Sequence, residues 1–154
     1  MAYRITAEPD YLRAELFHRE TVEETQDFLR AVVRDNAKLR RPCVLILVSV
    51  SKPIFKVVPH RLIEYIEELL GTSANQIALV GDTRDLHMSH EYIELLARQR
   101  RLNVRCFRDE RAALQWLKDR RRAEDRRKLR EWREQNERRE QVRRASPESH
   151  QLAG

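Results

Sequence analysis

The sequence predicts an α/β domain: a mostly parallel mixed sheet with an N-terminal β-hairpin, helices on the sheet, and a long charged C-terminal helix. Segments 43–48 and 76–80 are almost entirely apolar, which is typical of strands that helices cover on both faces. Around them, apolar residues recur at helical spacing over stretches long enough for right-handed crossovers. This alternation of strands and helices predicts a parallel sheet that begins with one antiparallel pair.

The chain opens on two short alternating segments, 3–6 and 11–16, separated by Glu8-Pro9-Asp10. Proline and aspartate favour a turn there, so we expect a hairpin. Next, Thr21 and Glu24 match a capping box, in which the Thr21 hydroxyl accepts from the amide three residues on and Glu24 reaches back. A helix of about 17 residues with one apolar stripe should follow. We expect it to end near residues 40–42.

The middle of the domain should place segment 43–48 as the central strand. The next helix is expected to begin at Pro59, a residue suited to the first helical position. It should end at Gly71, in the left-handed conformation that commonly follows a helix. Segment 76–80 then forms the second buried strand.

The last part of the domain should hold one more strand between two helices. Ser89 is a natural N-cap, which predicts a helix over 91–100. Segment 103–107 is the next strand, and Arg105 within it favours an edge position. Asp109 should cap a final helix. The residues expected to face the sheet from it are Ala112, Ala113, Trp116 and Leu117.

The formal charge of +6 is unevenly distributed along the chain. Residues 118–144 contain 13 basic and 7 acidic side chains, so the remainder has as many acids as bases. Apolar periodicity also stops after residue 117. We therefore expect a domain over 1–117, a charged helical extension over 118–145 and a disordered tail over 146–154.

Composition excludes several classes of protein. No apolar run, Val44–Val48 included, is long enough to cross a bilayer, and the first residues lack the features of a secretion signal. We expect a cytoplasmic protein that does not bind membranes. Three glycines cannot build a glycine-rich phosphate loop. Cys43 and Cys106 are expected to be reduced, buried thiols.

Three stretches resemble one known family. They are Tyr3-x-Ile5 with Asp10-Tyr11-Leu12, then Ile77-Ala78-Leu79-Val80, and a closing motif that runs from Val104-Arg105-Cys106-Phe107-Arg108-Asp109-Glu110 to Ala113-Leu114-x-Trp116-Leu117. Together they are similar to the STAS/SEC14-type, SpoIIAA-like (anti-sigma factor antagonist-like) bacterial domains over about residues 3–117. The resemblance implies a non-enzymatic regulatory or binding module. We expect no cofactor.

The resemblance also implies a phosphorylation switch at a serine that starts the helix after the central strand. The corresponding segment, 56–59, reads Lys-Val-Val-Pro and contains no serine or threonine. Ser49 and Ser51 lie nearby, at the end of the central strand, and whether either is phosphorylated stays open. This departure speaks against a kinase-controlled exchange of partners.

Ligands of mostly parallel sheets gather at the carboxyl ends of the strands. The polar segments expected there are 49–52, 81–85 and 108–109. The candidate ligand- or partner-binding residues are Ser49, Ser51, Lys52, Asp82, Thr83, Arg84 and Asp85. A cation site made by Asp82, Asp85 and Asp109 is an alternative, but Ser49 stands where a phosphoacceptor receiver needs aspartate. Turn formation and helix capping are the simpler roles for Asp82, Thr83 and Asp85.

No catalytic set of residues stands out. His87 and His90 have a spacing that can place both imidazoles on one helical face, but no further ligand nearby completes a metal site, and solvation at a helix start is the simpler interpretation. His18 and His60 are isolated, and Cys106 is expected to be a core residue. We therefore expect neither an enzyme nor a bound metal.

The extension carries opposite charges four residues apart, which favours a solvated helix. Candidate contacts to nucleic acid or a partner are Arg120, Arg121, Arg122, Arg126, Arg127, Lys128, Arg130 and Trp132. The leading hypothesis is a module that binds a protein or small ligand, with the extension contacting an acidic partner or a second copy of the chain. The alternative is a nucleic-acid-associated accessory protein that binds phosphates through the basic helix.

Overall fold

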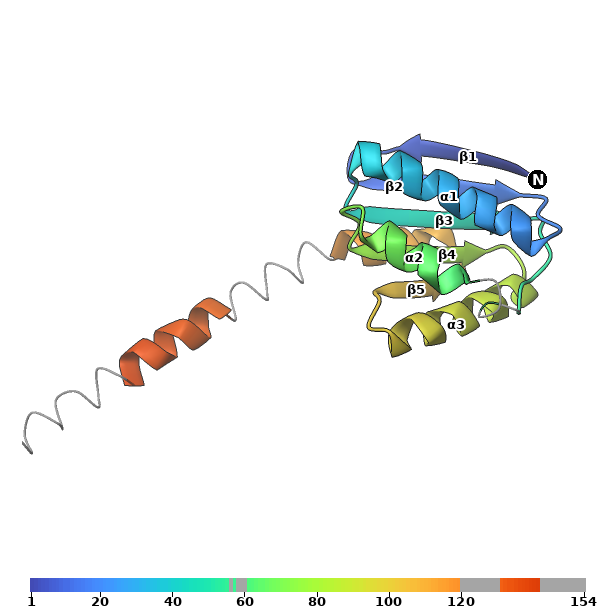
Figure 1. Ribbon diagram of the computed structural model, residues 1–154. Helices are drawn as coiled ribbons and strands as arrows, with labels where there is room; N and C mark the ends of the chain where they lie inside the picture. The colour runs from blue at the N-terminus through green and yellow to red at the C-terminus, as the bar shows by residue number, and fades with distance from the viewer. Residues whose placement is uncertain (56, 58–60, 120–130, 142–154) are drawn as a thin grey trace, which may run out of the picture. The chain divides into compact units, whose positions relative to one another are not determined.

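The computed structural model describes residues 1–55, 57, 61–119 and 131–141. The chain divides into two compact units, 1–117 and 118–154 (Figure 1).

The first unit contains a five-stranded mixed sheet in the order β1-β2-β3-β4-β5. β1 and β2 pair antiparallel, and each later neighbour pairs parallel. The strands are β1 (Ala2–Ala7), β2 (Tyr11–Phe17), β3 (Cys43–Ser49), β4 (Gln76–Gly81) and β5 (Val104–Phe107). The helices are α1 (Val22–Leu39), α2 (Leu62–Leu70) and α3 (Arg84–Gln99), and residues 110–119 are also helical. The predicted fold class, hairpin included, is confirmed.

The strand order explains which face each helix covers. From β2 to β5 every crossover moves one strand in the same direction. Right-handed crossovers that all move one way place their helices on the same face. Accordingly, α1, α2 and α3 lie together on one face of the sheet, and the helix over 110–119 lies behind it (Figure 1).

Alternation along the strands fills both layers of the core. Val44 and Ile46 of β3 belong to the cluster beneath α1, α2 and α3, whereas Leu45 belongs to the opposite cluster with Ala113 and Leu117. The partly buried rings of Phe107 and Trp116 extend that second cluster, with centroids 5.5 Å apart. Ala112, expected to face the sheet, is not part of the cluster.

Two of the predicted helix caps are confirmed. The Thr21 hydroxyl accepts a hydrogen bond from the Glu24 amide at 3.3 Å, and the Glu24 carboxylate accepts from the Glu20 amide at 3.1 Å. The Asp109 carboxylate accepts from the Ala112 amide at 2.8 Å. α1 ends as expected, at Arg40 in the left-handed conformation.

Two expectations about helix ends are wrong. Gly71 has φ −75°, so it continues the right-handed turn of α2. α2 begins at Leu62, and the expected start, Pro59, lies outside the described residues. α3 begins at Arg84, because Thr83 and not Ser89 is its N-cap. Ser89 lies inside α3, where its hydroxyl bonds the backbone of Ile54 instead.

Gly81 explains how β4 leads so directly into α3. A Cβ atom placed on Gly81 would lie 2.7 Å from the Cβ of Leu86. Only a residue without a side chain allows the first turn of α3 to pack this close to the strand end. The sharp turn therefore places the start of α3 at the carboxyl edge of the sheet.

In the second unit, residues 131–141 are helical and almost fully exposed, and Trp132 is 60% exposed. Residues 120–130 and 142–154 lie outside the described part of the chain. The candidate contacts at 120–122, 126–128 and 130 therefore carry no structural account. Among the residues that the structure describes, no helix has both the length and the apolar character to cross a membrane.

Candidate functional site

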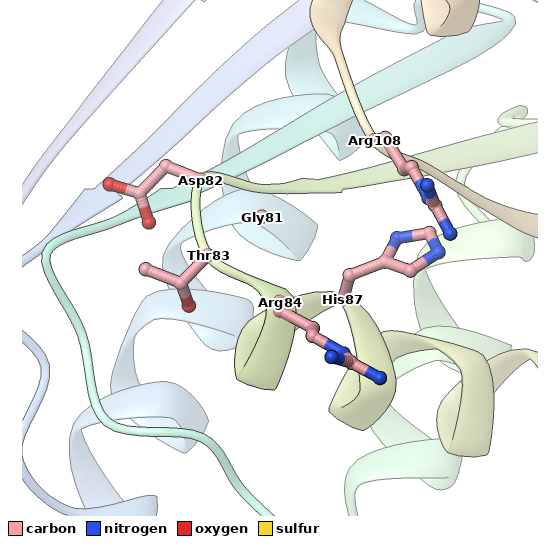
Figure 2. Close-up of a pocket in the computed structure, with 6 residues that line it drawn as sticks. All are labelled: Gly81, Asp82, Thr83, Arg84, His87 and Arg108. Atoms are coloured by element: carbon pink, nitrogen blue, oxygen red, sulfur yellow. The ribbon is translucent and has the colours of Figure 1, made fainter.

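A pocket of about 440 Å³ lies at the carboxyl edge of the sheet. Its lining residues come from the end of β4, the start of α3 and the residue after β5. They are Gly81, Asp82, Thr83, Arg84, His87 and Arg108 (Figure 2). Because the carboxyl ends of parallel strands meet at one edge, side chains far apart in sequence converge here.

The start of α3 supplies one wall of the pocket. The Thr83 hydroxyl accepts from the Leu86 amide at 3.2 Å and caps the helix. The remaining amides of the first turn give a helix start its partial positive charge. Asp85 lies exposed in this turn but does not line the pocket.

Two arginines make the pocket basic, and His87 lies beside them. The guanidinium groups of Arg84 and Arg108 are exposed and form no hydrogen bond or ion pair within the described chain. The Nε2 atom of His87 lies 3.0 Å from the Glu91 carboxylate, and its Nδ1 atom is buried without a hydrogen-bond partner among the described residues. Figure 2 shows the His87 ring near the Arg108 guanidinium. The two guanidinium groups can donate charge-assisted hydrogen bonds to an anion.

Asp82 has a different task from the basic side chains. Its carboxylate accepts from the Val50 amide at 3.1 Å and points away from His87 and Arg108 (Figure 2). Asp82 therefore stabilises the loop after β3. Across the described residues, no group of three His, Cys, Asp or Glu side chains gathers closely enough to hold a metal ion.

The serine segment does not line this pocket but surrounds Arg19. The Ser51 hydroxyl accepts from the Arg19 amide at 3.0 Å and donates to the Ser49 carbonyl at 2.9 Å. The Lys52 amide donates to the Arg19 carbonyl at 3.0 Å, and the Lys52 carbonyl accepts from Arg19 Nη2. The predicted set thus splits between the pocket, which takes Asp82, Thr83 and Arg84, and this loop, while Asp85 belongs to neither.

The expectation of two solvated histidines at a helix start is wrong. Since α3 begins at Arg84, both His87 and His90 lie inside it. His90 is buried, and burial together with the nearby positive charges of Arg19 and His87 lowers its pKa to about 3. It is therefore a neutral imidazole at physiological pH.

Arg19, His87 and Arg108 are the functional candidates that sequence reasoning missed or undervalued. Arg108 stood in a segment expected at the carboxyl edge, and His87 would have followed from an earlier start of α3. No sequence pattern marks Arg19 as buried, because it is one of 31 basic residues and nothing in its neighbourhood along the chain sets it apart.

The two cysteines form no disulfide. Cys43 is buried, as expected, and Cys106 is half-buried on β5. The Cys106 thiol donates to the Glu94 carboxylate at 2.9 Å, and burial with this carboxylate raises the pKa of the thiol to about 12. A thiol held protonated in this way is a poor nucleophile.

No family model matches this chain, and neither does any curated protein. One solved structure that it resembles is an uncharacterised DUF3478-family protein with a SpoIIAA-like fold from Shewanella loihica PV-4. The TM-score is 0.47 at 16% sequence identity, over 75% of this chain and 92% of that chain.

Proposed function

We propose that this chain is a non-enzymatic, STAS-like binding module that holds an anionic group of its ligand or protein partner in the carboxyl-edge pocket. The observation that carries the proposal is the convergence of Arg84, His87 and Arg108 on one pocket at the start of α3. Phosphate and carboxylate groups are the anions that such donors recognise.

The charge balance of the pocket supports an anion. Two guanidinium groups face it with no carboxylate bound to either within the described chain. The one acidic lining residue, Asp82, is already engaged by the Val50 amide. The positive end of α3 adds to the same potential. An anion here would gain charge-assisted hydrogen bonds from Arg84 and Arg108, neither of which has an ion pair within the described chain to give up.

The test is a titration with inorganic phosphate at constant ionic strength, followed by backbone amide NMR shifts. Phosphate should shift the amides of 81–87 and 108 in a saturable way. The double variant R84A/R108A should weaken binding by about tenfold or more, because two charge-assisted contacts are lost. The matched control R4A/R111A removes two exposed arginines elsewhere and should bind as the parent does. Equal binding by both variants would overturn the proposal.

A second candidate function rests on the extension. Residues 118–144 carry a net charge of +6, and Trp132 presents an exposed ring on which a base can stack. We propose nucleic acid as the alternative partner, and an acidic protein or a second copy as the leading one. Fluorescence titration of single-stranded DNA and RNA across salt separates them. Binding that weakens steeply with rising salt and is lost on truncation after residue 119 supports a nucleic-acid partner. No binding at low salt excludes it.

A further inference from the structure

A second, smaller cavity lies inside the domain. Its volume is about 40 Å³, and it sits in the core beneath α1, α2 and α3. Most of its lining is apolar, with Leu16, Phe28 and Ile93 among the residues. Three polar residues complete it: Arg19, Thr25 and His90. This cavity shares no residue with the carboxyl-edge pocket.

Each of these polar residues has one buried side-chain atom without a hydrogen-bond partner among the described residues. These atoms are Arg19 Nε, Thr25 Oγ1 and His90 Nδ1. The exposed fractions of these residues are 4%, 8% and 3%. Buried polar atoms in folded proteins are nearly always paired with protein, water or ligand. Three such atoms around one cavity therefore indicate a missing occupant.

Arg19 decides the charge of that occupant. Its Nη2 atom donates to the Lys52 carbonyl. The Glu24 carboxylate attracts the guanidinium from a distance, but no contact ion pair forms between them in the described chain. Burial lowers the pKa of the guanidinium to about 10, which leaves it charged at neutral pH. His90 is neutral, so Arg19 is the one cation among the three polar residues. A buried charge is costly unless an opposite charge accompanies it.

The backbone keeps this guanidinium where it is. Arg19 is tied to the loop after β3 through Ser51 and Lys52, and the same loop is fixed to α3 through Ile54 and Ser89. Hydrogen bonds from the amide and to the carbonyl of Arg19 thus hold this residue, and with it the cation, in place. Arg19 is prepared to bind before any ligand arrives, which reduces the cost of ordering the site.

We propose that this cavity binds a short-chain organic monocarboxylate, with its carboxylate on Arg19 Nε and the Thr25 hydroxyl and its alkyl group among the apolar side chains. His90 Nδ1 can serve as a further donor when the proton resides on that nitrogen. One water needs about 10–15 Å³ of such space, so the cavity has room for about three water-sized groups. That suits a carboxylate with one or two carbons more. Water alone fills the same space but brings no negative charge into contact with Arg19.

The experiment uses propionate, with 1-propanol as its uncharged analogue, at constant ionic strength. Propionate should give saturable shifts of the Arg19 Nε–H and His90 side-chain resonances, and 1-propanol should give none. Arg19→Met keeps the apolar length but removes the charge, and should weaken propionate binding by about tenfold or more. The exposed control Arg34→Met should bind normally.

Two further variants keep the test decisive. If Arg19→Met fails to fold, Thr25→Val removes one donor without changing the size of the side chain, and should also weaken propionate binding. R84A/R108A should leave it unchanged, which separates this site from the carboxyl-edge pocket. Equal effects of propionate and 1-propanol, or full propionate binding by both Arg19→Met and Thr25→Val, would overturn the proposal.

Discussion

The Asp82 carboxylate and the Val50 amide join the ends of two neighbouring strands by a hydrogen bond of 3.1 Å. In return, the Asp82 amide donates to the Val48 carbonyl at 3.3 Å. Val50 has φ 48°, a left-handed conformation that a β-branched residue rarely adopts. The paired bonds stabilise this turn, and with it the loop that carries Ser51 and Lys52 to Arg19.

Replacement of Asp82 by alanine should therefore reduce stability without harming anion binding. We expect the free energy of unfolding to fall by about 1–2 kcal/mol, since the Val50 amide loses its acceptor. Asp82→Asn retains an acceptor and should lose less. Urea denaturation measures both. Phosphate affinity should hold or rise, because a negative charge has left the pocket; abolished phosphate binding in a folded D82A protein would contradict this assignment.

Gly81 should tolerate substitution much less well than Gly71. In Gly81→Ala the new Cβ would meet the Leu86 Cβ at 2.7 Å, and relieving such crowding typically costs about 1–3 kcal/mol. In Gly71→Ala the nearest atom is the Glu68 carbonyl oxygen at 3.2 Å, and the backbone is already right-handed. Thermal unfolding of the two variants should rank them clearly. Similar destabilisation by both would show that the turn after β4 can adjust.

The fold was largely predictable because its signals are local. The segments that are apolar on both faces predicted β3 and β4. The helix caps are local too, because Thr21 and Asp109 accept hydrogen bonds from amides only three residues away. The start of α3 was not predictable in this way, since Thr83 and Ser89 are both good N-caps. A contact with Ile54, far away in the sequence, gives the Ser89 hydroxyl its partners.

The candidate site was predictable only in part, for a related reason. The rule for parallel sheets located the carboxyl edge and with it Thr83 and Arg84. His87 and Arg108 come close together because β5 pairs with β4, and the spacing of residues along the chain does not reveal this pairing. The burial of Arg19 depends on a loop that follows the next strand. Long-range contacts of this kind leave no periodic pattern in a sequence.

Cys106 should react slowly with alkylating reagents until the pH is high. Its pKa of about 12 leaves very little thiolate at pH 8, and the thiolate is the reacting form. Glu94→Gln removes a carboxylate that raises this pKa, so the alkylation rate at pH 8 should increase. The rate is measured with iodoacetamide in a Cys43→Ala background. Glu91→Gln, which removes a weaker electrostatic effect, is the matched control and should change the rate less.

Acid should destabilise the domain through His90. Its pKa is about 3 in the folded protein and near 6.5 in the unfolded chain, so between these values the unfolded chain binds more protons. Stability is therefore complete above about pH 6.5 and is lost as the pH falls toward 3, by at most about 1.4 kcal/mol per pH unit from this residue. Urea denaturation at pH 7, 6 and 5 measures that slope. His90→Gln loses packing at every pH, yet its stability should depend less on pH over this range. An unchanged slope in that variant would show that His90 is not the group that acid protonates.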